Sequence, residues 1–203
     1  ADLGQPDEDN IEDIRTRMLA CGAREMILAD IKTAICQAGL QLVQAQARYE
    51  GGYWNTTGLA RHVVVEAMLP EMHRRNIATM GHGATGRGND QVRFELAFHA
   101  LAPDLEVIAP WRLWEIRSRE DALAYAERHG VPVEQKAGDL YSRDQNLLHL
   151  SHEGEDLEDP WNAPPASLYR ITRNTDQTEA SPETVDVGFE SGIPVSVDNE
   201  GLT

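Results

Sequence analysis

The sequence predicts an α/β domain with a doubly wound parallel sheet, followed by a region of different character. Up to Val133, short apolar runs alternate with segments of helical periodicity. This alternation is typical of a parallel sheet covered by helices on both faces. Beyond Val133, Pro, Asn, Asp and Ser become frequent and the helical periodicity ends. We therefore expect two domains, residues 1–132 and residues 133–203, with the boundary between residues 131 and 140.

The expected elements of the first domain follow one another in the order of a wound α/β fold. Apolar residues at helical spacing, such as Ile11, Ile14 and Met18, indicate helices. Short apolar runs flanked by turn residues indicate buried strands. The expected helices are residues 11–23, 31–49, 59–76, 90–102 and 119–130, and the expected strands are residues 24–30, 77–83 and 105–110.

Capping and helix-breaking residues mark the ends of these helices. Glycine suits the C-terminal cap, whereas Ser, Thr, Asn and Asp suit the N-terminal cap. The expected caps, in chain order, are Gly22, Thr56 or Thr57, Asn89 or Asp90, Ser118, and Gly130. Pro70 lies inside the third helix and is expected to kink or divide it.

The region beyond Val133 reads mainly as β-structure. Residues 167–174 have the composition of a strand, and residues 184–198 read as a hairpin that turns near Ser191 and Gly192. Ser142 is expected to cap a short helix formed by the sequence RDQNLLHL that follows it.

Composition and charge exclude several classes of protein. The formal net charge is −16, from 34 acidic and 18 basic residues, and such a surface argues against nucleic-acid binding. No apolar run approaches the roughly 18 to 20 residues needed to cross a bilayer, so we expect a soluble, cytoplasmic protein without a membrane partner. Cys21 and Cys36 fit neither a redox pair nor a zinc site and are expected to be buried, reduced thiols.

The stretch GHGATGRGNDQVRFE carries the strongest chemical signal. It follows an expected strand, and ligands of open α/β sheets bind beyond the carboxyl ends of the strands. Its glycines let backbone amides face a ligand, and the next helix offers its positive end to an anion. These glycines are Gly81, Gly83, Gly86 and Gly88. The stretch matches neither GxGxxG nor the Walker pattern, so its spacing alone fits a plain strand-to-helix turn equally well.

Six separated motifs can be recognised along the chain. They are DLGQ at residues 2–5, Tyr53 with NTTGLAR at 55–61, HGATGRGNDQVRFE at 82–95, VIAPWR at 107–112, YSRDQNLLHLSHEG at 141–154 and LEDPWNAPP at 157–165. In this order and at these distances they resemble the argininosuccinate synthase family over essentially the whole chain. The resemblance implies an adenine nucleotide alpha hydrolase-like domain of the ATP pyrophosphatase type, followed by the start of an α+β synthetase domain.

The resemblance also implies a reaction, that of a ligase of arginine biosynthesis and the urea cycle. The family joins citrulline and aspartate, uses ATP with Mg²⁺, and releases AMP and pyrophosphate. The ureido oxygen of citrulline is a poor leaving group until it is adenylated, after which the aspartate amine attacks the activated carbon. Holding both amino acids and the nucleotide in line can supply several kcal/mol through orientation. The full-length enzyme is expected to be a homotetramer.

Motif position assigns ligand contacts to individual residues. Ala1 and Gly83 correspond to ATP contacts of the family. Thr85, Asn89 and Asp90 correspond to its aspartate-binding residues. The implied citrulline contacts are Tyr53, Thr57, Asn89, Arg93, Ser142 and Ser151. No catalytic residue and no metal ligand is assigned.

Several side chains near these motifs have simpler interpretations. Tyr53, beside a glycine, could be an ordinary aromatic residue that closes a loop. His82 invites a role as a base because an unperturbed histidine titrates near neutrality, but its place among glycines favours a structural or orienting role. His149 and His152 have no partner at ligand spacing, so we expect them at the surface or in packing rather than on a metal.

The sequence departs from the family pattern in ways that bear on activity. It contains no SGGxDTS run, which in the family cradles pyrophosphate, and its two ends read as interrupted. We expect a central fragment that is inactive alone, since contacts to a transferred group typically supply orders of magnitude in rate. Gly58 stands where many members carry a serine, and Thr56 or Thr57 is expected to replace that hydroxyl.

Two other functions remain open on the sequence alone. One is a different adenylating ATP pyrophosphatase, either tRNA-thiolating or amide-forming. The charge of −16 argues against tRNA, and Tyr53 together with the serines favours citrulline. The other is a non-catalytic remnant that only binds a ligand or a partner. Amino-acid-dependent release of pyrophosphate by a full-length version and calorimetric titration would discriminate among the three.

Overall fold

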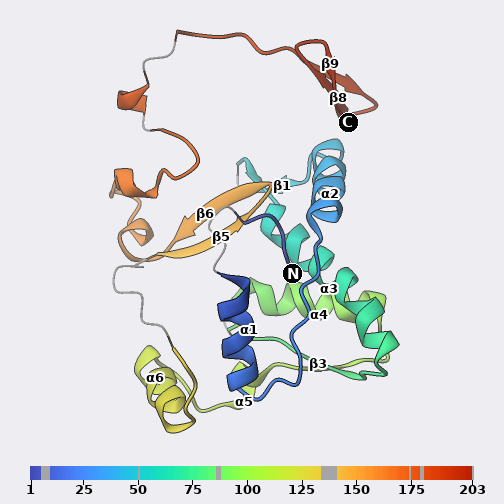
Figure 1. The fold of residues 1–203 in the computed structure, drawn as a ribbon. Coiled ribbons are helices and arrows are strands. Elements are labelled where there is room, and N and C mark those ends of the chain that lie inside the picture. Colours follow the sequence, from blue (N-terminus) through green and yellow to red (C-terminus); the bar gives the residue numbers. More distant parts are fainter. Residues whose placement is uncertain are drawn as a thin grey trace.

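A computed structural model describes residues 1–5, 10–49, 51–85, 88–133, 141–173, 175–178 and 181–202. The helices are α1 (Ile11–Ala20), α2 (Lys32–Gln44), α3 (Thr56–Arg74), α4 (Asn89–Leu101), α5 (Pro110–Leu113) and α6 (Arg119–Arg128) (Figure 1). The strands are β1 (Arg48–Tyr49), β2 (Tyr53–Trp54), β3 (Thr79–Gly81), β4 (Glu106–Ile108), β5 (Ser142–Asn146), β6 (His149–Glu153), β7 (Val187–Glu190), β8 (Ile193–Val197) and β9 (Glu200–Gly201). Three short 3₁₀ helices are η1 (Glu155–Glu158), η2 (Ala166–Leu168) and η3 (Thr175–Gln177).

The first part of the chain contains parallel strand pairing, as its alternating pattern predicts. β3 and β4 pair in parallel, with Met80 opposite Val107. Connected by α4, they form a β-α-β unit, which confirms the expected strands near residues 79 and 107. The described part of this sheet has two strands.

Residues 24–30 differ from the expected strand. A single parallel bridge joins Asp30 to Asp2, where the Asp2 amide donates to Ala29 O at 2.7 Å and the Ile31 amide donates to Asp2 O at 3.0 Å. The apolar composition of this segment therefore predicted a strand correctly only at its last residues, because strand formation depends on a partner along the whole length.

Two hydrophobic clusters hold the helices together. The first surrounds the fully buried Val65 and Phe98 and joins α3 to α4. The second surrounds the fully buried Ile35 and Ala60 and joins α2 to α3. Leu148, in the turn between β5 and β6, packs against the second cluster. α3 is therefore the common wall against which α2, α4 and the β5–β6 hairpin are placed (Figure 1).

α3 differs from its expected form at both its start and its middle. It runs unbroken past Pro70, so the expected division there is wrong. Asn55 occupies the N-cap position, and Thr56 and Thr57 lie inside the first turn instead of capping it. Because Thr57 does not cap the helix, its hydroxyl is available to contact His149 on β6.

α1 lies outside both clusters, and none of its residues is buried. Cys21, at its C-terminal cap, and Cys36, on α2, are both free thiols, and both are exposed. The absence of a disulfide between them agrees with the sequence, but the expected burial is wrong. The exposed faces of α1 and α2 place these thiols outside the two cores.

The second part of the chain is built from antiparallel hairpins. β5 and β6 pair along their whole length, and β7, β8 and β9 form a three-stranded sheet whose β8 contacts α2 (Figure 1). The hairpin turn at Ser191 and Gly192 confirms the sequence prediction, and both residues have positive φ. The strand expected over residues 167–174 is wrong: its described residues form the end of η2 and turns.

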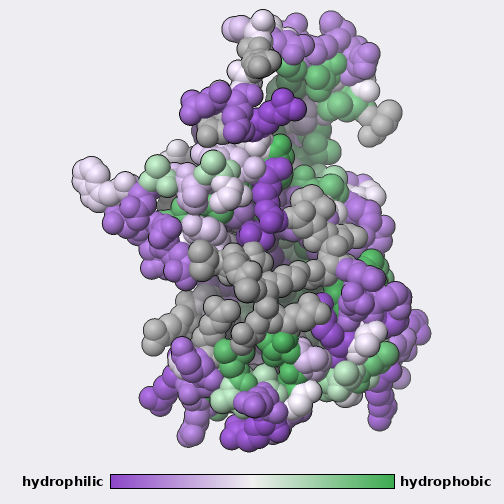
Figure 2. Space-filling view, turned by 60° about the vertical axis from the view of Figure 1, so that its left-hand side comes forward, coloured by the Kyte–Doolittle hydropathy of each residue, from purple (hydrophilic) through white to green (hydrophobic). Residues whose placement is uncertain are grey.

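The surface agrees with the high content of charged residues. Among the coloured residues of the face seen in Figure 2, hydrophilic side chains predominate, with hydrophobic patches between them. In the described parts of the chain, we find no helix that combines the length and the apolar character needed to cross a membrane.

Candidate functional site

A cavity of about 630 Å³ lies where α3, the start of α4, and the β1–β2 and β5–β6 hairpins meet. Charged side chains of both signs line it, and they come from segments far apart in the sequence. The lining residues are Tyr49, Tyr53, Thr57, Arg61, Gly83, Ala84, Thr85, Gly88, Asn89, Asp90, Arg93, Ser142, Arg143, Asp144, Ser151, His152 and Glu153.

The loop between β3 and α4 forms one wall of the cavity. The Gly88 amide donates to the Thr85 carbonyl at 3.2 Å, which closes the turn before the helix. Gly88 is the N-cap of α4 and Asn89 its first helical residue, so the expected capping by Asn89 or Asp90 is wrong. Both side chains instead line the cavity, beside the positive end of the helix, which attracts anions.

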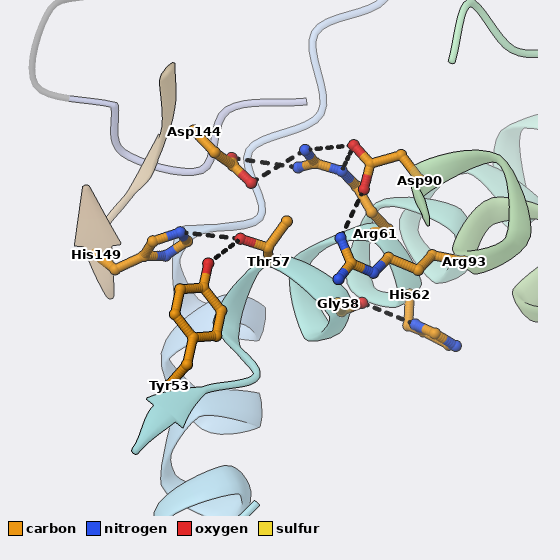
Figure 3. A network of polar contacts seen from close by, with 9 residues as sticks. All are labelled: Tyr53, Thr57, Gly58, Arg61, His62, Asp90, Arg93, Asp144 and His149. Carbon is orange, nitrogen blue, oxygen red and sulfur yellow. Dashed lines mark hydrogen bonds and ion pairs between the residues drawn. The ribbon is translucent and has the colours of Figure 1, made fainter. Parts of the chain in front are cut away.

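A network of ion pairs crosses the cavity wall (Figure 3). The guanidinium of Arg61 lies 2.9 Å (Nε) and 2.8 Å (Nη2) from Oδ2 of Asp90. On its other side it lies 3.1 Å (Nη2) and 3.4 Å (Nη1) from the two carboxylate oxygens of Asp144. Arg93 reaches Oδ1 of Asp90 at 2.9 Å, as the spacing of one helical turn predicts. Two cations and two anions thus balance each other.

A second set of polar contacts joins three segments at the other side of the cavity. Oγ1 of Thr57 lies 3.3 Å from the Tyr53 hydroxyl and 3.1 Å from Nε2 of His149 (Figure 3). The Tyr53 ring also packs beside Tyr49, with 5.1 Å between ring centroids. One buried threonine hydroxyl therefore connects the β1–β2 hairpin, α3 and the β5–β6 hairpin.

Burial and charge set the ionisation of two of these groups. Burial by itself would raise the pKa of Asp90, but the hydrogen bonds from Arg61 and Arg93 outweigh it and hold that pKa below its ordinary value. Burial lowers the pKa of His149, and the nearby Arg61 adds to the effect while Asp144 opposes it. Near neutral pH, Asp90 in the cavity lining is therefore ionised, and His149, hydrogen-bonded to the lining residue Thr57, is neutral.

Comparison with known protein families decides which family this chain represents. The model described as the arginosuccinate synthase N-terminal HUP domain matches residues 1–132. The model described as the arginosuccinate synthase C-terminal domain matches residues 141–203. The chain belongs to the argininosuccinate synthase family. The first match confirms the adenine nucleotide alpha hydrolase-like class of the expected fold.

Individual argininosuccinate synthases are similar along the whole chain. The protein of Thermoanaerobacter sp. (strain X514) is 42% identical over 201 residues, which cover 98% of this chain and 48% of the relative. That of Moorella thermoacetica is 45% identical over 202 residues, which cover 99% of this chain and 49% of the relative. That of Roseiflexus castenholzii is 43% identical over 203 residues, which cover 100% of this chain and 50% of the relative. The chain thus spans about half the length of the curated relatives it matches.

The residues that the argininosuccinate synthase motifs predict as ligand contacts come together in this cavity, with one exception. Gly83, Thr85, Asn89, Asp90, Tyr53, Thr57, Arg93, Ser142 and Ser151 all line it. Ala1 does not: it lines a separate pocket of about 240 Å³, bordered by apolar residues of α3 such as Val64 and Met68. Gly86, one of the glycines expected to face a ligand, lies outside the described residues.

Ser142 lines the cavity as a strand residue and not as the helix cap that the sequence predicts. It begins β5 and does not cap a helix. In the β5–β6 pairing Asp144 lies opposite Ser151, and Ser142 lies opposite Glu153. The expected helix over RDQNLLHL is wrong because pairing with β6 supplies the backbone hydrogen bonds that a helix would otherwise make.

Sequence reasoning missed three residues that shape the site. Arg61, Asp144 and His149 all lie within motifs that identify the family, but no contact in the site was predicted for them. Weak signals were present: Arg61 follows Thr57 by one helical turn, and Asp144 follows Ser142 by two strand positions, so each shares a face with a predicted contact. His149 was expected at the surface or in packing, yet it is hydrogen-bonded to Thr57.

His82 and Gly58 lie behind the cavity wall. The His82 ring is buried, stacks on Phe94 and places Nε2 3.4 Å from Oε1 of Glu95, which agrees with a structural role. At Gly58, an added Cβ would clash with the side-chain oxygen of Asn55, so that side chain would have to move. The residues described here include no group of three or more His, Cys, Asp or Glu side chains placed to hold a metal ion.

Proposed function

We propose that this chain forms the amino-acid-binding part of an argininosuccinate synthase, a ligase that joins citrulline and aspartate with ATP. One observation carries the proposal: predicted citrulline and aspartate contacts from four separate segments line a single cavity. Packing alone would not require polar residues from two hairpins and two helices to line one cavity. The family assignment over both parts of the chain supports the same conclusion.

The charges of the cavity suit two amino acids. Each substrate carries a carboxylate, which the guanidinium group of Arg93 and the amides at the start of α4 can hold. Each also carries an ammonium or amine group, for which Asp90, Asp144 and Glu153 offer carboxylates. We assign Thr85, Asn89 and Asp90 to aspartate. We assign Tyr53, Thr57, Asn89, Arg93, Ser142 and Ser151 to citrulline.

The chemistry that these residues perform is positioning. When the ureido oxygen of citrulline has been activated, the aspartate amine must approach the ureido carbon in line, and fixed partners for both amino acids provide that geometry. The hydrogen bonds from Arg61 and Arg93 that hold the pKa of Asp90 below its ordinary value keep this carboxylate ionised near neutral pH, ready to accept from an ammonium group. No side chain of this chain is assigned as a general acid or base.

ATP is assigned to the edge of the same cavity, with Gly83 as a backbone contact. Ala1 fits less well, because it lines the separate apolar pocket. The printed sequence contains no SGGxDTS run to cradle phosphates. We propose that Mg²⁺ arrives bound to ATP, and that the chain alone binds the amino acids without joining them. Argininosuccinate formed by the purified chain with ATP, citrulline and aspartate would contradict this last proposal.

Three further assignments complete the proposed function. We propose that residues 1–132 and 133–203 belong to two domains, and that β3 and β4 belong to a doubly wound parallel sheet of the complete HUP domain. We propose that the full-length enzyme is a cytoplasmic homotetramer. The net charge of −16 supports the absence of a nucleic-acid partner, and we expect no membrane partner.

Isothermal titration calorimetry with L-citrulline and L-aspartate tests the proposed function. We expect both to bind the chain, and Arg93→Met to weaken citrulline binding by roughly tenfold or more, as the loss of a charged hydrogen bond does. Arg74→Met is the matched control, because Arg74 is exposed on α3 and pairs only with Glu71 among the described contacts. Equal losses in both variants, or binding of neither amino acid, would contradict the assignment.

A further inference from the structure

Arg61 occupies a position that no assigned role explains. It lies on α3, yet its guanidinium contacts carboxylates from two other elements, Asp90 on α4 and Asp144 on β5 (Figure 3). The side chains of the three residues are 18%, 30% and 21% exposed, so the ion pairs are only partly screened by water. A planar guanidinium can hold two carboxylates in fixed directions, which a lysine ammonium cannot do.

Both oxygens of Asp90 are held in this arrangement. Oδ2 accepts from Arg61, and Oδ1 accepts from Arg93. The carboxylate plane is therefore fixed by partners on two helices, and it cannot rotate without breaking a charged hydrogen bond. An Asp90 fixed in this way presents a constant set of acceptor directions to a ligand in the cavity.

The second contact of Arg61 controls the opposite wall. Asp144 lies directly across from Ser151 in the β5–β6 pairing, so the strand position of Ser151 depends on where Asp144 is held. The hairpin has an apolar anchor at its turn, where Leu148 packs against the core. The Thr57–His149 contact adds a second anchor beside the turn, at the first residue of β6. Without the Arg61 contact, these anchors would hold the turn end of the hairpin but leave the strands farther from the turn able to shift.

We propose that Arg61 is the positioning residue of this cavity, whose single guanidinium orients the Asp90 carboxylate and, through Asp144, sets the distance between α4 and the β5–β6 hairpin. The proposal builds on the proposed function, because the two walls that it aligns are those assigned to aspartate and citrulline. Arg61 itself acts through Asp90 and Asp144, and no direct contact with a substrate is required.

The test compares Arg61→Met with Arg75→Met. Arg75 ends α3 and also pairs with two carboxylates, Glu25 and Glu71, but it lies outside the cavity. The two variants therefore remove the same charge and the same number of carboxylate partners from one helix. Three quantities are measured: the Asp90 carboxyl pKa by ¹³C NMR, hydrogen exchange of the β5–β6 amides, and affinity for citrulline and aspartate by calorimetry.

We expect Arg61→Met to raise the pKa of Asp90, to speed exchange in β5–β6, and to weaken both amino acids by roughly tenfold or more. Arg75→Met should change none of the three. Asp144→Asn cuts only the hairpin side, so it should speed exchange while the pKa of Asp90 stays low. If Arg61→Met does not fold, Asp144→Asn by itself tests whether the Arg61–Asp144 contact holds the hairpin.

Two results would overturn the proposal. One is an unchanged Asp90 pKa in folded Arg61→Met, and the other is unchanged β5–β6 exchange in Asp144→Asn. Arg61→Lys should recover part of the Asp90 pKa shift but not the slow exchange, because a compact ammonium on a flexible stem lacks the planar, separated donors that fix both carboxylates in direction. If the unmodified chain binds neither amino acid, the proposed function fails, while the NMR and exchange data still decide the role of Arg61.

Discussion

Replacing Thr57 by valine removes one hydroxyl and almost nothing else. The two side chains have nearly the same shape and similar helix propensities. The substitution breaks the contacts of Oγ1 with the Tyr53 hydroxyl and with Nε2 of His149. Within the described residues Nδ1 of His149 is already buried without a hydrogen-bond partner. The variant would therefore leave both nitrogens of a half-buried imidazole unsatisfied.

The expected cost follows from these contacts. Leaving a buried polar group without its partner costs about 1 to 3 kcal/mol, so Thr57→Val should lower the free energy of unfolding by that amount. Tyr53 adds little, because it is 40% exposed and its hydroxyl can turn to water. Thr56→Val is the matched control: Thr56 is equally buried in the same helical turn, but its hydroxyl makes only a long contact of 3.4 Å with Trp54 O. Its loss should cost less than about 1 kcal/mol.

Urea unfolding followed by tryptophan fluorescence measures both variants. Thr57→Ser, which keeps the hydroxyl, should retain most of the stability that Thr57→Val loses. A double-mutant cycle with His149→Leu should give a coupling energy of about 0.5 to 3 kcal/mol. Equal destabilisation by Thr57→Val and Thr56→Val, or a coupling energy near zero, would refute the idea that the Thr57–His149 contact holds the hairpin to α3.

Three further outcomes are expected. Because burial lowers the pKa of His149, the unfolded chain binds more protons than the folded chain near pH 6, so the free energy of unfolding should fall as the pH drops from about 8 to about 5. His149→Gln should reduce that fall in urea titrations at each pH, and an unchanged pH dependence would contradict the assignment. Gly58→Ser should stabilise α3 by less than the roughly 1 kcal/mol that helix propensity offers, because the added Cβ forces the Asn55 side chain, which makes no capping hydrogen bond, to turn away; lower stability in urea unfolding would show that Asn55 cannot move. Phe98→Ala should cost about 3 to 5 kcal/mol in thermal or urea unfolding, because Phe98 is fully buried between α3 and α4, and a cost below about 1 kcal/mol would contradict its role in the core.

Two features set by neighbours in the chain were predicted correctly. Ser118 begins α6 with a full capping box, in which it accepts from the Asp121 amide and Asp121 accepts from the Ser118 amide. The turn at Ser191 and Gly192 likewise needs only residues in sequence order. In both cases the bonding partners lie within a few residues, so the local sequence contains all the information that the structure uses.

Features that depend on distant partners were predicted poorly. Residues 167–174 have strand-like composition but form turns in their described part, and Ser142 begins a strand although its local sequence suits a helix cap. The β-structure of a segment depends on whether a partner strand reaches it, and no local pattern reports that. The exposure of Cys21 and Cys36 was missed for the same reason, since burial is decided by what packs against a helix.

The same distinction between local sequence signals and distant partners applies to the residues of the site. The motifs alone identified the family and nine of the 17 residues that line the cavity. They did not reveal that Arg61 bridges Asp90, 29 positions away, and Asp144, 83 positions away. An ion pair forms where folding brings two charges together, and its energy depends on distance and burial in space. The tertiary structure therefore decided how the predicted residues are held, and it made Arg61 a central part of the site.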